Sequence, residues 1–324
     1  MANPRSLFTE INSHSSKIKI MKFLKPIVVI IIFCCVGTLS AQRYKTKKKL
    51  KSTETLKEQL QFTNASLENI LVVDNVYGSI DLEGYNGNTI QIEVTKTIYA
   101  DTKEDLAKGK KEIGIKTAKK NTAIYVYLDS PYSHFDLETG NFEHREFNYN
   151  YRRNYKHRTK RMYKYSLDYK IRIPKNTSID LKAVNRGNIL VKNVHGKLLI
   201  VKNINGAIDM KNVSGKTDVD ALNKDINITY MKNPTEESWY RSLNGDINIR
   251  FKDNLNAMIS YKTMNGGFYT NFDVEKTEAK IMKTQERKSR GAKYKINSNK
   301  NFKIGNGSVH LHFNQLNGDA ILKK

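Results

Sequence analysis

Two histidines near the end of the chain have a spacing that could support chemistry. His310 and His312 alternate with Val309, Leu311 and Phe313, so both imidazoles are expected on the outer face of a strand. Two histidines at positions i and i+2 of a strand can chelate a metal ion. No cysteine or acidic residue lies near them in the sequence to complete a ligand set. The sequence therefore predicts surface histidines and no metal site.

Four aspartates raise two other kinds of chemistry: Asp209, Asp218, Asp220 and Asp225. Calcium-binding β-rolls use the pattern G-G-x-G-x-D, and none of these aspartates follows paired glycines. Carbohydrate cleavage would need two carboxylates on one strip of the surface. Asp209 and Asp218 share the same offset from a glycine, but they are expected on opposite faces of the repeat. We expect neither a calcium site nor a catalytic pair, and keep a carbohydrate-active enzyme that uses Asp218 or Asp220 as the alternative function.

A third segment interleaves basic and aromatic side chains. Asn141–Lys164 reads NFEHREFNYNYRRNYKHRTKRMYK and contains eight Lys/Arg and six aromatic residues. Such a segment can contact phosphates or carboxylates while its rings stack on a ligand, or it can be a solvated loop that caps the repeat. We expect contact with an anionic polysaccharide or an envelope surface, and no specific binding of nucleic acid. The residues predicted to make this contact are Arg145, Tyr149, Tyr151, Arg152, Arg153, Tyr155, Lys156, Arg158, Lys160 and Arg161.

The net charge and residues 1–41 indicate the cellular location of the protein. The chain has 324 residues and a formal net charge of +24, which suits an anionic partner or keeps a repetitive β-protein soluble. Residues 1–41 include a basic stretch, an apolar stretch and small residues before Gln42, which predicts a signal peptide that begins at Met1 or Met21. Cys34 and Cys35 both lie in it, so the mature chain is expected to lack cysteine and a membrane span. The sequence thus predicts an exported protein, either periplasmic or at the cell surface or secreted.

The chain then divides by composition. Residues 42–61 are lysine-rich and predict a basic flexible leader, and residues 62–324 predict a β-strand-repeat domain with an insertion at 129–164. Asp101 or Thr102 can cap one short helix near residues 102–113. No G-x-S-x-G motif occurs, so nothing supports a serine nucleophile.

A glycine recurs about every ten residues through most of this domain. Apolar residues follow most of these glycines at the second and fourth positions, as Ile189 and Val191 follow Gly187. The same frame places Leu198 and Ile200 in the core. Because the apolar period is two, the repeating element is a strand. The turn glycines are Gly78, Gly187, Gly196, Gly206, Gly215, Gly245, Gly266, Gly307 and Gly318.

The spacing predicts an all-β fold, a β-solenoid or β-roll in which two strands make one circuit of about twenty residues. An antiparallel meander or sandwich is the rival architecture. Glycine is expected in the turns because it adopts positive φ without strain. Asparagine tolerates the same conformation, and it precedes five of these turn glycines, at Asn205, Asn244, Asn265, Asn306 and Asn317.

The units VKNVHGKLLIVKNINGAIDMKNVSGK and RSLNGDINIRF, entered through IRIPKNTSIDLKAVNRGNI, resemble the putative-adhesin family of exported bacterial β-strand-repeat domains of unknown function. The resemblance covers Ser66–Lys324 and is strongest over Ile171–Phe251. It implies an adhesin-like repetitive β-fold with no defined active site and no cofactor.

We therefore expect a non-catalytic adhesin-like protein with a binding or structural role at the cell envelope. A third hypothesis, beside binding and carbohydrate cleavage, is an envelope-stress accessory protein without a ligand of its own. The sequence leaves the oligomeric state open.

Overall fold

The computed structural model describes residues 49–144, 162–277, 281–284, 293–296 and 300–324. The predicted signal peptide and the ten predicted contact residues between Arg145 and Arg161 lie outside these ranges. Among the described residues, no helix has both the length and the apolar character needed to cross a membrane.

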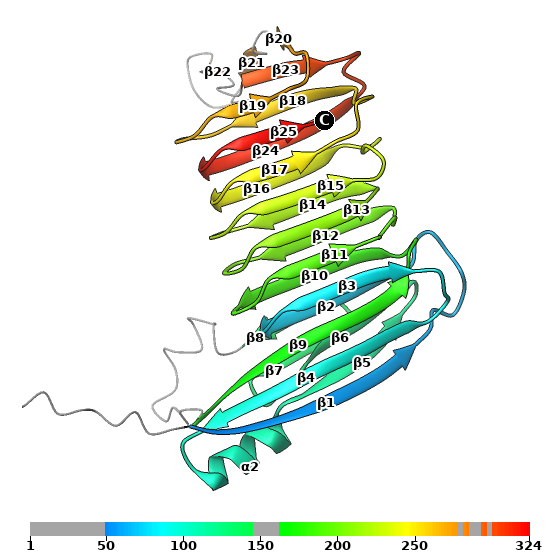
Figure 1. The fold of residues 1–324 in the computed structure, drawn as a ribbon, viewed down its shortest axis with the longest axis vertical. Coiled ribbons are helices and arrows are strands. Elements are labelled where there is room, and N and C mark those ends of the chain that lie inside the picture. Colours follow the sequence, from blue (N-terminus) through cyan, green and yellow to red (C-terminus); the bar gives the residue numbers. More distant parts are fainter. Residues whose placement is uncertain (1–48, 145–161, 278–280, 285–292, 297–299) are drawn as a thin grey trace, which may run out of the picture. The chain divides into compact units, whose positions relative to one another are not determined.

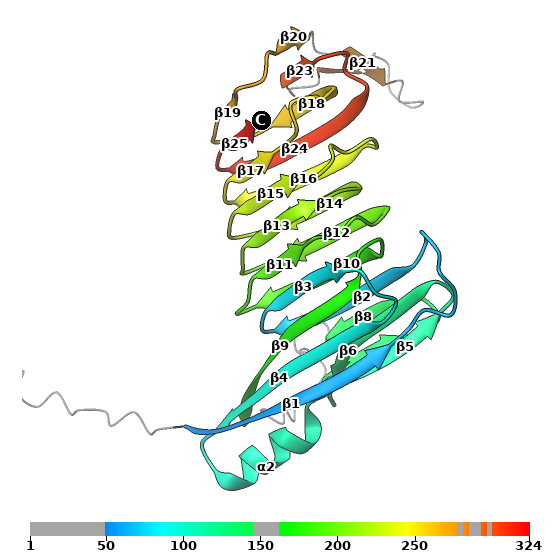
Figure 2. The same cartoon turned by 45° about the vertical axis from the view of Figure 1, so that its right-hand side comes forward.

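The described residues from Lys49 onward form two large sheets (Figures 1 and 2). Sheet A contains, in spatial order, β1 (Leu50–Leu60), β4 (Ile90–Ala100), β9 (Tyr163–Pro174), β3 (Ile80–Tyr85), β11 (Ile189–Lys192), β13 (Ile208–Val213), β15 (Ile226–Tyr230), β17 (Ile247–Arg250), β25 (Ala320–Lys323) and β19 (Phe268–Thr270). Sheet B contains β20 (Glu275–Thr277), β23 (Lys300–Ile304), β18 (Ala257–Lys262), β24 (Val309–Asn317), β16 (Ser238–Asn244), β14 (Lys216–Ala221), β12 (Leu198–Asn203), β10 (Ser178–Asn185), β2 (Ile70–Tyr77), β6 (Ala123–Asp129) and β5 (Gly114–Lys120). Two hairpins, β7–β8 (Ser133–Asp136 and Asn141–His144) and β21–β22 (Ile281–Thr284 and Lys293–Ile296), pair separately.

The repeat is a parallel solenoid. Consecutive strands alternate between the sheets, and each strand pairs in parallel with the strand one circuit away, as Leu181 of β10 pairs with Val201 of β12 and Val201 with Val219 of β14. The apolar side chains of both sheets meet in one core, where Ile189, Val191 and their equivalents are fully buried. The predicted all-β solenoid is confirmed, and the antiparallel meander is wrong for this region.

One unit departs from the predicted frame. Leu199 and Val201 are fully buried, whereas Leu198 and Ile200 are only half-buried. The register of the strand pairing explains this difference. Leu199 pairs with the buried Thr217 of the next circuit, so Leu199 and not Leu198 points into the core. Gly196 therefore lies one residue further from its strand than the other glycines do.

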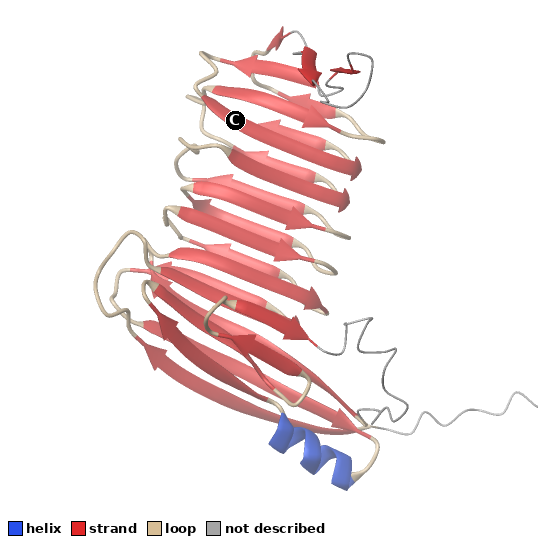
Figure 3. Ribbon diagram, turned by 180° about the vertical axis from the view of Figure 1, so that it is seen from behind, coloured by secondary structure: helices blue, strands red, loops and turns tan. Residues whose placement is uncertain are grey.

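The N-terminal end of the stack is closed by antiparallel strands and a helix. Helix α2 (Lys103–Glu112) begins where the sequence predicts, with Thr102 accepting a hydrogen bond from the backbone N–H of Asp105, and Figure 3 shows it at this end. The flexible leader predicted at residues 42–61 is wrong over Leu50–Leu60, which form β1 against β4. One polar residue of β1, Glu54, has a structural role, because its Oε1 atom lies 2.5 Å from the ammonium of the buried Lys96 of β4.

The C-terminal circuit does not lie where chain order would put it. β24 pairs in parallel with β16 on one side and β18 on the other, and β25 lies likewise between β17 and β19. The last residues of the chain are thus inserted between two circuits that are consecutive in sequence. Figure 1 shows the C-terminus within the stack.

The predicted reason for the turn glycines is only partly right. Positive φ occurs at Gly78, Gly215, Gly266, Gly307 and Gly318, but not at Gly187, Gly196, Gly206 or Gly245. A Cβ on Gly206 would lie 1.9 Å from the carbonyl oxygen of Gly187 in the circuit below. The circuits stack so closely at this corner that no side chain fits, and the glycines are required by proximity as well as by conformation.

Four of the five asparagines before the turn glycines, all except Asn306, have a different role from the one predicted. None of them has positive φ. Instead, Asn205 donates to Asn185 at 2.9 Å, and Asn223 donates to Asn205 at 2.9 Å. The ladder continues through Asn244, Asn317 and Asn265. These side-chain amides join circuit to circuit along the corner.

Candidate functional site

The outer face of sheet A carries a row of cations. Outward positions of neighbouring strands align because side chains alternate between the two faces. The basic row is Arg172, Lys192, Lys211, Arg250 and Lys323, from β9, β11, β13, β17 and β25. Strand pairing puts Glu83 between Arg172 and Lys192, and Thr229 between Lys211 and Arg250.

The basic row faces solvent. Lys211, Arg250 and Lys323 are exposed, and Lys192 is half-buried. The row runs across seven neighbouring strands along the stacking axis. Neighbouring strands lie about 4.8 Å apart. Cations held at such intervals on a rigid sheet can bind an extended polymer that carries regularly spaced negative charges.

A polar groove of about 690 Å³ lies at the N-terminal end of this row. It is lined by side chains of β1, β4, β9 and β3, including Lys57, Glu93, Lys170 and Arg172. Its ionisable lining is mixed, with three basic and four acidic residues. The Arg172 guanidinium lies 4.5 Å from the centre of the Tyr85 ring. The groove therefore suits a polar ligand rather than a strongly anionic one.

On the outer face of sheet B, the two carboxylates of the alternative hypothesis are engaged by one arginine. Arg241 of β16 donates through Nη2 to Asp218 and lies with Nε 3.5 Å from Asp220. A nucleophile or general base has to reach a substrate, but these carboxylates already bind a guanidinium. This geometry gives no support to catalysis by Asp218 or Asp220.

The other two aspartates stabilise the stack. Asp209 accepts a hydrogen bond from Asn227 at 2.9 Å. Asp225 accepts one from the backbone N–H of Asp246 at 2.9 Å. As the sequence predicts, Asp209 and Asp218 lie on different sheets.

A pair of buried tyrosine hydroxyls also has a structural role. The hydroxyls of Tyr230 and Tyr240 lie 2.6 Å apart, and Tyr230 donates to Thr217 at 2.8 Å. Burial raises the pKa of Tyr230 and of Tyr240. Both hydroxyls stay neutral between the sheets, out of reach of a substrate.

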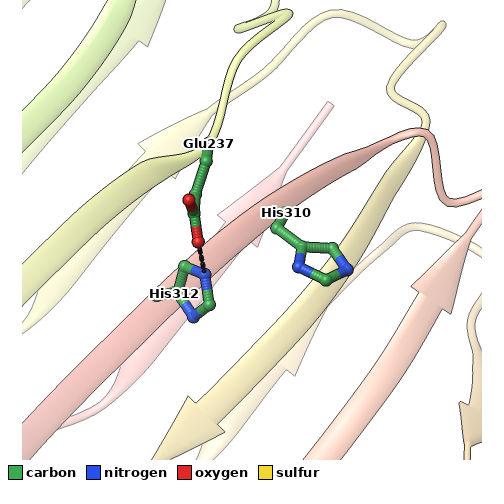
Figure 4. Close-up of side chains that lie close together, drawn as sticks. All are labelled: Glu237, His310 and His312. Atoms are coloured by element: carbon green, nitrogen blue, oxygen red, sulfur yellow. Dashed lines mark hydrogen bonds and ion pairs between the residues drawn. The ribbon is translucent and has the colours of Figure 1, made fainter.

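The structure corrects the expectation for the histidines. His310 and His312 do lie on the outer side of β24, but an acid is close by. The Oε1 atom of Glu237 lies 2.6 Å from Nε2 of His312 (Figure 4). One ligand atom from each of Glu237, His310 and His312 lies within 4.8 Å of the others.

Sequence reasoning missed Glu237 because it lies more than seventy positions from the histidines. It immediately precedes β16, and only the inserted C-terminal circuit brings β24 beside β16, where Ser238 pairs with Leu311. The ring of Trp239 stacks on His312, with 3.8 Å between the ring centres and 10° between the planes. No pattern within either segment alone could reveal this pairing.

Residues 178–304, which run from β10 to β23, match the family model Toastrack DUF4097. This match confirms the resemblance to adhesin-like β-repeat domains of unknown function. A comparison with curated proteins gives no match. A solved structure, that of a putative cell adhesion protein from Clostridium sporogenes ATCC 15579, is similar at 11% identity and a TM-score of 0.40, and the similarity covers 85% of this chain and 99% of that one.

Proposed function

Because residues 178–304 match the Toastrack DUF4097 family model, we propose that this protein is a non-catalytic binding module that acts outside the cytoplasm. Its ligand would be an extended anionic polymer, such as an acidic polysaccharide of the cell envelope. The observation that carries the proposal is the basic row on sheet A.

Three properties of the basic row support this function. It presents cations on five of seven neighbouring strands of a hydrogen-bonded sheet, so the backbone positions of these cations are fixed before a ligand arrives, which lowers the ordering cost of binding. The only acid in the row, Glu83, accepts a hydrogen bond from Asn193 at 3.3 Å. The excess positive charge of the whole chain would also speed the encounter with an anionic surface.

The basic and tyrosine-rich segment would be a second contact. This part of the proposal rests on sequence alone, because Arg145–Arg161 lie outside the described residues. It would enlarge the binding surface by adding aromatic rings to the cations.

The test compares two double charge reversals in the chain without residues 1–41. Lys192→Glu/Lys211→Glu changes the basic row, and Lys202→Glu/Lys262→Glu makes the same change in net charge on the outer face of sheet B. Binding to polygalacturonate is measured by fluorescence anisotropy over a salt series. We expect the first variant to bind at least about tenfold more weakly and with a shallower salt dependence, because fewer counterions are released.

The control variant is expected to bind like the unchanged protein. Equal losses in both variants would mean that only net charge matters, and would contradict a role for the basic row. Binding that is absent, or insensitive to salt, in the unchanged protein would refute the anionic ligand itself. Deletion of residues 145–161 measures the second contact separately.

A further inference from the structure

Glu237, His310 and His312 form a cluster at the surface of sheet B that the proposed function does not use. We propose that this cluster is a binding site for a divalent transition-metal ion, of which Zn²⁺ is the simplest example. The proposal is independent of the basic row, which lies on the other sheet.

The donor set fits such an ion. Two imidazole nitrogens and one carboxylate oxygen are ligands that Zn²⁺, Cu²⁺ and Ni²⁺ accept, and a site with three protein ligands leaves a position for water or an external ligand. Mg²⁺ and Ca²⁺ prefer sites made wholly of oxygen. The chemistry of the cluster thus selects transition metals.

The geometry needs only side-chain adjustment. Ligand atoms of a tetrahedral Zn²⁺ site lie roughly 3.3 Å apart, given bonds of about 2.0 Å. The three donors here lie within 4.8 Å of one another, and Glu237 Oε1 lies 2.6 Å from His312 Nε2. To bind such an ion, the Glu237 carboxylate must move away from His312 Nε2 by about 0.7 Å. The Glu237 side chain is 52% exposed and can move.

The backbone and a neighbouring ring hold the histidines in place. His310 and His312 lie on β24, which is hydrogen-bonded on both sides, to β16 and to β18. Trp239 stacks on His312, and the rings of His310 and His312 lie 5.9 Å apart at 84° to each other. Lys303, two strands from His310 in the same row, is paired with Glu275 at 2.8 Å. The charges around the site therefore do not oppose a metal ion strongly.

Trp239 provides a built-in reporter because it is the chain's single tryptophan. A paramagnetic ion held by His312 would lie next to the indole and quench its fluorescence. Zn²⁺ would not quench in this way, so it should protect the emission by competition.

The experiment uses the chain without residues 1–41 and without a histidine tag. Calorimetric titration with ZnCl₂ is expected to show about one equivalent bound, and titration with CuCl₂ should quench Trp239 in a way that Zn²⁺ reverses. His310→Ala, His312→Ala and Glu237→Gln should each weaken Zn²⁺ binding at least about tenfold, since even outer-shell changes cost that much at metal sites.

His195→Ala is the matched control. His195 is a partly buried histidine whose Nδ1 lies 2.9 Å from the hydroxyl oxygen of Ser214, at another corner of the stack. Its loss should leave binding unchanged. Circular dichroism and thermal unfolding without metal establish that each variant is folded. Zn²⁺ binding that is absent, or that persists unchanged in His310→Ala and Glu237→Gln, would overturn the proposal.

Discussion

Single glycines decide whether circuits of this solenoid can stack. At Gly206 the added Cβ of any other residue would meet the backbone of Gly187 at 1.9 Å. The obstacle is a carbonyl oxygen in a hydrogen-bonded circuit, which cannot rotate away as a side chain could. The same argument explains why glycine recurs at corners where φ is not positive.

Gly206→Ala should therefore destabilise the protein strongly, by about 3 kcal/mol or more, as overpacking against an immovable neighbour does. Gly114→Ala is the control, because its nearest neighbour is the Asp129 Cβ at 3.8 Å. Urea unfolding of both variants measures the difference. A Gly206→Ala cost as small as that of Gly114→Ala would contradict the close stacking.

Asp180 is a second residue with a testable energetic effect. Burial raises the pKa of this carboxyl above its ordinary value of 3.8, against the opposing effect of the nearby Lys202. A folded pKa above the unfolded one means that the native state binds more protons between the two values. Stability therefore falls as the pH rises through that window and stays lower above it.

Asp180→Asn is expected to raise the melting temperature at pH 7 and to lose this advantage as the pH approaches 3.8. Thermal unfolding between pH 4 and pH 8 tests the sign. Asp253→Asn, at an exposed position, supplies the comparison. A destabilised Asp180→Asn at neutral pH would show that ion pairing with lysine outweighs burial at this site.

At the scale of elements, the C-terminal circuit is the unusual feature. Leu311, Phe313 and Leu322 are almost fully buried, and the Phe313 ring stacks on Tyr240 with 4.9 Å between their centres. β18 and β19 reach β16 and β17 only through this circuit. The last part of the chain is therefore needed to join elements that precede it.

Removal of residues 309–324 should unfold the end of the stack, since each large buried side chain lost costs about 2–5 kcal/mol. Hydrogen-exchange mass spectrometry should show lost protection over β18 and β23, with the strands from β2 to β12 retaining more. Removal of Lys324 alone leaves every strand pair intact and serves as the control. Protection of β18 that survives the larger truncation would mean that it repacks directly on β16.

At the scale of the whole molecule, one scaffold presents two chemically different faces. Sheet A exposes the basic row, and sheet B exposes Trp239, Arg241 and the histidine cluster. The basic row arises because outward side chains of stacked parallel strands align from circuit to circuit. The histidine cluster arises because β24 lies beside β16.

The local pattern of this sequence was enough to predict strands, turns and helix α2. Alternation at Ile189 and Val191 and the cap at Thr102 depend on neighbours a few residues away, so they can be recognised without the fold. The glycine spacing likewise predicted a coil of two strands per circuit. By contrast, the polar sequence of β1 predicted a flexible leader. The strand forms because it pairs with β4, which follows it by about forty residues in the chain, and no local pattern indicates that pairing.

The order of the circuits and the contacts between their side chains could not be predicted from local sequence. The one-residue shift at Leu199 follows from pairing with Thr217, not from its own glycine. Glu237 joins His310 and His312 because the chain returns to insert β24 beside β16. Strand pairing is non-local, and a short strand has much the same sequence whichever neighbour it takes. The amino-acid sequence therefore determines the repeating unit, whereas the long-range backbone pairing determines the surface that the units build.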